Sequence, residues 1–137
     1  MRVNPYLNFN GDCAAAFEFY ARCLGGTVEA MMTHRGSPME SQTPPDRLDT
    51  VMHARLVVDG SVLMGSDSPP EYFARAQGFH VTVNLDDPTK AERVFAALAE
   101  GGEVRMPIQE TFWAKRFGML VDRFGIPWMV NCEAAGH

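Results

Sequence analysis

The chain has 137 residues, 46% of them hydrophobic and 21% charged, a composition typical of one ordered globular domain with its own core. Its formal charge of −5, without Lys or Arg runs, argues against nucleic acid or an acidic membrane as a partner. No apolar run approaches the roughly 20 residues of a membrane span, and the first residues do not resemble a signal peptide. Three cysteines without C-x-x-C spacing indicate reduced thiols, so we expect a cytoplasmic protein.

The first half of the chain predicts a strand, a helix and three further strands. An alternating segment over 3–9 precedes apolar residues at helical spacing, and Gly25-Gly26 ends that helix. A strand is expected over 27–34, followed by a polar, proline-rich loop. Residues 50–67 predict two strands joined at Asp59-Gly60, a pair typical of short hairpins.

The same order of elements returns after an irregular connector. A strand is expected over 79–86, then a helix that begins near Pro88, and then three strands within 103–132. The pairs Gly25-Gly26 and Gly101-Gly102 have the same separation as Phe19 and Phe95, so the chain repeats a β-α-β-β-β unit. We therefore predict a single domain over 1–137, with module one at 1–67, a connector at 68–78 and module two at 79–134.

Three segments of this repeat resemble a known family. They are PYLNFNGDCAAAFEFY (5–20), HARLVVDGSVLMGSD (53–67) and QETFWAKRFGMLVDRFGIPWMVN (109–131). These segments resemble the PhnB-like branch of the vicinal-oxygen-chelate superfamily, which includes glyoxalases, extradiol dioxygenases and bleomycin-resistance proteins. The resemblance implies an α+β fold in which two βαβββ modules form a curled sheet around a cavity. It also implies a homodimer, and open sheet edges give a physical reason for one.

The resemblance further marks four strand positions where catalytic members of the superfamily bind a divalent metal. In this sequence they fall at Pro5 or Tyr6, at Met64, at His80 and at Met129. Only His80 suits such an ion, because thioether sulfur is a soft donor that prefers Cu(I). We therefore expect no metal and no other cofactor, and a metal-dependent glyoxalase or dioxygenase is the least favoured function. The chain also lacks a Gly-x-Gly loop after a strand, which argues against methyltransferase chemistry.

Three titratable residues are candidate catalytic groups. His80 shares a strand face with Thr82, so it either contacts a ligand or is a partly exposed histidine on an open sheet. His53 either makes one buried hydrogen bond or acts as a general base, since imidazole titrates near neutral pH. Glu110 lies beside two aromatic residues, which can make a carboxyl a useful general acid; the alternative is a solvated loop carboxylate.

Six further residues are candidate ligand contacts on the cavity floor or at its mouth. Aromatic rings at a mouth stack on flat ligands, and methionine adapts its shape to varied ligands. Alternation along the last strand places Trp128 beneath a helix, and it places Met129 and Asn131 toward the cavity. The six are Met64, Thr82, Phe112, Trp113, Met129 and Asn131.

Two functions of different classes remain open on the sequence. One is a binding protein without metal, whose cavity holds a small apolar or aromatic molecule. The other is a metal-independent enzyme of lyase or isomerase type, in which His80 or His53 moves a proton while Glu110 or Asn131 orients the substrate. In both, the 35–49 loop is a candidate lid, because polar, proline-rich loops beside clefts often gate them.

Overall fold

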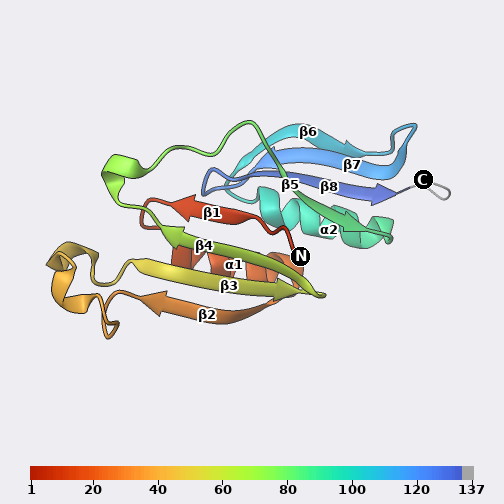
Figure 1. Cartoon of the computed structure of the whole chain (residues 1–137). Helices are drawn as coiled ribbons and strands as arrows, with labels where there is room; N and C mark the ends of the chain where they lie inside the picture. The colour runs from red at the N-terminus through yellow and green to blue at the C-terminus, as the bar shows by residue number, and fades with distance from the viewer. Residues whose placement is uncertain (134–137) are drawn as a thin grey trace. The chain divides into compact units, whose positions relative to one another are not determined.

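The computed structural model describes residues 1–133 and divides the chain into two compact units, residues 1–74 and 75–137. Each unit has one α-helix and one four-stranded mixed sheet (Figure 1). Residue 134, the last of the predicted second module, lies outside the described residues. Neither helix within residues 1–133 is long and apolar enough to cross a membrane.

The first unit follows the predicted order of one strand, one helix and three strands. Its elements are β1 (Tyr6–Phe9), α1 (Cys13–Leu24), β2 (Thr27–Thr33), β3 (Val51–Val58) and β4 (Ser61–Asp67). The strands lie in the order β1-β4-β3-β2, with β1 parallel to β4 and the other neighbours antiparallel. Three short 3-10 turns lie in its loops, η1 (Glu40–Gln42), η2 (Pro45–Arg47) and η3 (Pro70–Tyr72).

The second unit repeats this connectivity. Its elements are β5 (Val81–Leu85), α2 (Pro88–Ala99), β6 (Glu103–Gln109), β7 (Ala114–Val121) and β8 (Pro127–Glu133). The strand order is β5-β8-β7-β6, with β5 parallel to β8. The match between the two units confirms the predicted βαβββ repeat, in the form of two separate four-stranded sheets.

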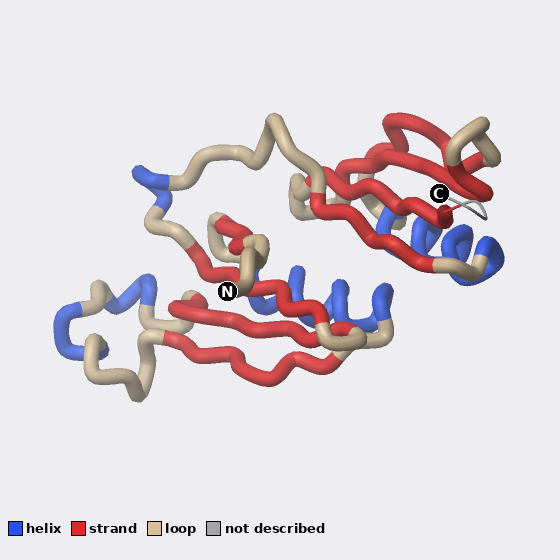
Figure 2. The backbone as a smooth tube through the Cα atoms, turned by 45° about the vertical axis from the view of Figure 1, so that its right-hand side comes forward, coloured by secondary structure: helices blue, strands red, loops and turns tan. Residues whose placement is uncertain are grey.

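Each helix covers one face of the sheet in its own unit (Figure 2). Helix α1 ends at Gly25, whose left-handed φ of 73° lets its N–H donate to the carbonyl of Ala21. Helix α2 begins at Pro88, and the Asp87 side chain caps it by accepting from the Thr89 N–H at 2.9 Å. The helix residues that pack against the sheets are Cys13, Ala16, Phe17, Phe19 and Tyr20 in α1, and Ala91, Val94, Phe95 and Leu98 in α2.

A glycine in each sheet allows its helix to approach closely. A Cβ placed on Gly65 of β4 would lie 2.8 Å from a ring carbon of Phe17 in α1. A Cβ on Gly118 of β7 would lie 2.6 Å from a ring carbon of Phe95 in α2. The absence of a side chain at these two positions therefore sets how near the phenylalanine of each helix comes to its sheet.

A buried carboxylate ties three elements of the first unit together. Asp67, at the end of β4, is 7% exposed. Its Oδ1 accepts from the backbone N–H groups of Gly11 (2.9 Å) and Cys13 (3.0 Å), and its Oδ2 accepts from that of Val51 (2.9 Å). Asp12 occupies the N-cap position of α1, yet its side chain makes no capping hydrogen bond. Asp67 therefore caps this helix from a distant strand and also anchors the start of β3.

Replacing Asp67 with Ala should lower the free energy of unfolding by about 3 kcal/mol or more, because three buried backbone N–H groups lose their acceptor. Urea unfolding followed by circular dichroism measures this. Asp12→Ala is the matched control, since this carboxylate is exposed and caps nothing, and its effect should stay within about 0.5 kcal/mol. Equal losses in the two variants would contradict the role assigned to Asp67.

Candidate functional site

The faces of the two sheets turned away from the helices carry most of the predicted site residues. In β3 and β4 the alternate residues Ala54, Leu56, Leu63 and Gly65 are buried toward α1. The residues between them point to the other face and are half-buried. The same alternation holds in β7 and β8, so each unit has an open face on which neighbouring strands align their side chains.

The open face of the first unit is charged and polar. Tyr6, Met64 and Arg55 are Cα partners across β1, β4 and β3, so they form one row. The Arg55 guanidinium lies 3.0 Å from the Glu29 carboxylate of β2. Arg55, the neighbour of Met64 in this row, is therefore paired with a carboxylate of β2.

His53 lies on the same face and meets a tyrosine. Its Nδ1 is 3.5 Å from the Tyr6 hydroxyl oxygen, and the two ring centroids are 6.0 Å apart at 30°. The histidine is half-buried, and its Cα partner on β2 is Met32. The structure thus gives His53 a hydroxyl neighbour at the outer limit of a hydrogen bond.

The middle of the second unit's open face is uncharged, and we call this part the second open face; the charged Lys115 and Glu133 follow at its end, on the same side of β7 and β8 by alternation. It consists of two rows of Cα partners across β5, β8, β7 and β6. One row runs through a hydroxyl and three thioethers, and the other through amides and one phenyl ring. The rows are Thr82, Met129, Met119 and Met106, and then Asn84, Asn131, Phe117 and Gln109.

Trp128 and Val130 point to the opposite side of β8. Trp128 is 1% exposed and Val130 is fully buried, whereas Met129 and Asn131 are half-buried. Alternation along this strand therefore separates core from open face as the sequence predicts. The Trp128 indole N–H donates to Asp122 Oδ2 at 2.8 Å, which satisfies its one polar group inside the core.

The structure brings three predicted ligand contacts together on the second open face. Thr82, Met129 and Asn131 lie on adjacent strands, with Thr82 and Met129 as direct partners. His80 is half-buried and comes just before β5, two residues from Thr82. Met64 belongs to the open face of the first unit.

The aromatic pair lies in the turn between β6 and β7. Phe112 is 92% exposed and Trp113 is 38% exposed, with ring centroids 4.8 Å apart in an edge-to-face arrangement. Trp113 also meets Phe117 at 5.4 Å, so three rings extend from the turn to the second open face. Glu110 is exposed in the same turn.

The four metal positions implied by the fold family hold side chains that do not fit a divalent ion. Met64 occupies one of them in the first unit and either Pro5 or Tyr6 another, of which Tyr6 is the direct Cα partner of Met64; His80 and Met129 occupy two in the second. Within residues 1–133, no group of three or more His, Cys, Asp or Glu side chains could hold a metal. Two neutral thioethers, a phenol and one imidazole lack the hard donors that such an ion needs.

The first turn of α1 holds a buried thiol. Burial, and to a smaller extent the charge of Asp67, raise the pKa of Cys13 to about 12. A position at a helix N-terminus can lower a thiol pKa, but burial outweighs that effect here. Cys13 therefore packs as a small apolar residue.

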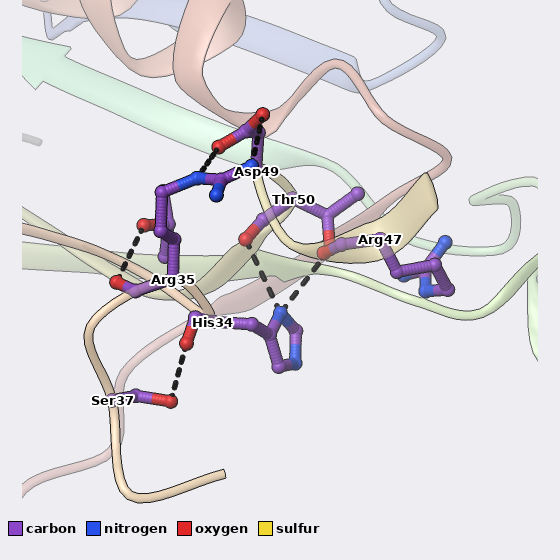
Figure 3. Close-up of polar contacts among 7 residues, drawn as sticks. His34, Arg35, Ser37, Arg47, Asp49 and Thr50 are labelled. Atoms are coloured by element: carbon purple, nitrogen blue, oxygen red, sulfur yellow. Dashed lines mark hydrogen bonds and ion pairs between the residues drawn. The ribbon is translucent and has the colours of Figure 1, made fainter. Parts of the chain in front are cut away.

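The long loop between β2 and β3 is closed at its base by polar contacts (Figure 3). Arg35 binds Asp49 through Nε–Oδ1 at 2.8 Å and Nη2–Oδ2 at 3.2 Å, and this pairing holds the pKa of the Asp49 carboxyl below its usual value. His34 Nδ1 lies 3.3 Å from the Thr50 carbonyl oxygen, and Ser37 donates to the His34 carbonyl at 2.6 Å. The role of this loop as a lid stays a prediction.

Sequence reasoning did not select five side chains of the second open face, which are Asn84, Met106, Gln109, Phe117 and Met119. Phe117 and Met119 alternate along β7, and the same period of two that selected Met129 would have found them. Asn84 follows from the alternation in β5, but nothing in the sequence shows that its amide meets Asn131. That contact depends on the parallel pairing of β5 with β8.

The sequence over residues 1–131 matches the family described as 3-demethylubiquinone-9 3-methyltransferase. Protein PA1353 from Pseudomonas aeruginosa has a crystal structure that is 51% identical, with a TM-score of 0.89 over 97% of this chain and 98% of that one. Protein YjdN of Escherichia coli strain K12 is 34% identical over 96% of this chain and 95% of its own length. The chain therefore belongs to this family.

The fold is also present in more distant proteins. A glyoxylase/bleomycin resistance protein/dioxygenase domain from a Frankia species has a TM-score of 0.66 at 16% identity, covering 100% of this chain and 94% of that one. At this identity the likeness shows the fold alone.

Cys13 should resist alkylation in the folded protein. With a pKa near 12, its thiolate at pH 8 is about a thousandfold scarcer than that of an ordinary thiol. Burial raises the pKa of Cys13 in the folded state only. The buried neutral thiol therefore stabilises the fold fully below the ordinary thiol pKa, and this stabilisation is lost as pH rises toward 12. Peptide mapping after iodoacetamide treatment at pH 8 should find Cys23 modified before Cys13. Modification of Cys13 first, without denaturant, would refute this.

Proposed function

We propose that this protein binds a small apolar or aromatic molecule without a divalent metal. The observation that carries the proposal is the makeup of the second open face, where Met106, Met119 and Met129 form one row beside Phe117. Flexible thioethers and a phenyl ring provide an adaptable apolar surface, and a few amides beside them can fix a ligand's orientation. The cavity implied by the family resemblance stays a prediction.

The aromatic residues of the β6–β7 turn support the same proposal. Phe112, Trp113 and Phe117 form a continuous series of edge-to-face contacts that leaves the first ring almost fully exposed. An exposed phenyl ring gains free energy when a ligand covers it, at about 25 cal/mol per Å² of apolar surface. A flat ligand on the second open face would therefore extend toward these rings.

A metal-independent acid/base enzyme is the second candidate function. The proximity of His53 Nδ1 to the Tyr6 hydroxyl favours it, because an imidazole beside a phenol supplies two groups that could move protons to or from a substrate placed there. His80 is the other candidate base, and it lies beside the second open face. Glu110 lies in an exposed turn. It therefore lacks the apolar surroundings that make a carboxyl group a useful general acid, which argues against this role. The homodimer also remains a proposal.

A charge placed on the second open face should weaken ligand binding. Met129→Lys should raise the dissociation constant for the probe 2-acetylnaphthalene at least about tenfold, because an apolar ligand would have to desolvate the ammonium group. Isothermal titration calorimetry measures the change.

Ala96→Lys provides the control, since it adds the same charge on the exposed side of helix α2. It should leave the dissociation constant within about twofold of the parent chain. The proposal fails if the parent chain does not bind the probe, or if both variants weaken binding equally.

A further inference from the structure

We propose that the ligand of the second open face is neutral and presents an amide edge, an N–H beside a C=O, to Asn84 and Asn131. This inference rests on the proposed binding function and specifies the chemical class of its ligand. It follows from the way the two asparagine side chains pair, from the ring next to them and from the lack of charge in their two rows.

The two asparagines are joined by a single hydrogen bond. Asn131 Nδ2 donates to Asn84 Oδ1 at 3.2 Å, across the parallel strands β8 and β5. This bond uses one donor and one acceptor, so the pair keeps Asn131 Oδ1 as an acceptor and Asn84 Nδ2 as a donor. If the amide oxygen and nitrogen are exchanged in both side chains, the hydrogen bond reverses its direction. The pair still keeps one donor and one acceptor. The pair therefore offers a neighbouring donor and acceptor in either orientation.

A group that matches this pair must itself carry one donor next to one acceptor. A primary amide or a lactam does so, because its N–H and C=O lie on one planar unit. A ketone supplies only the acceptor, and a carboxylate supplies two acceptors and a charge. An amide is therefore the group that satisfies both asparagines at once.

The ring beside the pair indicates an aromatic amide. Phe117 is the direct Cα partner of Asn131, so its side chain is the next one along the same row. Met129 and Thr82 form the neighbouring row, one step along the same strands. An amide group held by the asparagines would thus place its aromatic part over Phe117 and the thioethers.

The charge of the surface indicates a neutral ligand. None of the eight residues that form the second open face is charged, and Lys115 and Glu133, the next residues on this side of β7 and β8, have opposite charges. A carboxylate placed between the two asparagines would lose water without gaining a charged partner from these eight side chains. A neutral amide loses less solvation, and its two hydrogen bonds replace what it loses.

Three probes of one shape test this inference: 2-naphthamide, 2-acetylnaphthalene and 2-naphthoate. Titrations of the full chain, followed by two-dimensional ¹⁵N NMR, give dissociation constants and report the side-chain amide signals of Asn84 and Asn131 directly. We expect 2-naphthamide to bind at least about threefold more tightly than either relative, as one net hydrogen bond allows. The two amide signals should shift with the amide and much less with the ketone.

Single variants locate the preference. Asn84→Ala and Asn131→Ala should each weaken binding of the amide more than binding of the ketone, so that the advantage of the amide falls below about twofold. Asn8→Ala is the matched control, since Asn8 is an exposed asparagine on β1 in the first unit, and it should preserve the advantage.

The possible failures are distinguishable. If none of the three probes binds, the proposed function itself falls. If the ketone and the amide bind equally well, or if the preference for the amide survives both variants, the binding function stands and the amide inference is overturned. Tighter binding of 2-naphthoate would instead show that the site selects an anion, and it would overturn the inference in the same way.

Discussion

Each unit of this protein has one helix for a sheet with two faces, and its other features follow from that constraint. A strand alternates its side chains, so burying one face beneath a helix commits every second residue to the core. In β8, Trp128 and Val130 are therefore buried in the core, and Met129 and Asn131 lie on the open face. Core and candidate site are thus interleaved along the same strand, and a shift of one residue in register would exchange them.

Much of this organisation could be predicted from the sequence because it depends on local patterns. The repeat, the hairpin at Asp59-Gly60 and the helix end at Gly25 follow from periodicity and from residues with special backbone conformations. The burial of Trp128 follows from alternation in the last strand. Such features involve neighbours in the chain, and a single sequence records them well.

The remaining features depend on contacts between distant segments. Nothing in the sequence separates Asp67, which accepts three backbone hydrogen bonds, from Asp12, which stands at the helix start and caps nothing. The pairing of Asn84 with Asn131 likewise depends on which strands become neighbours in the sheet. Irregular register between β6 and β7 also decides that Met106 lies beside Met119. Alternation in one strand cannot predict these partners.

The family description names a methyl transfer, whereas the proposed function is the binding of a small molecule. The sequence has no Gly-x-Gly loop, and each unit is a mixed sheet with one helix, unlike the doubly wound parallel sheet that binds cofactors through such a loop. At the positions where other superfamily members hold a metal, two methionines take the place of harder donors. Thioethers at these positions are soft, neutral donors that suit a divalent ion poorly.

Methyl NMR of the methionine side chains tests the central claim most directly, because the chain's nine methionines are distributed over both units. With ¹³C-labelled methionine methyl groups and 2-acetylnaphthalene as the ligand, the signals of Met106, Met119 and Met129 should shift most and saturate together. Met39, which is exposed in the β2–β3 loop, serves as the reference signal. Shifts of the same size at Met39, or unchanged signals for the three methionines of the second open face, would contradict the account.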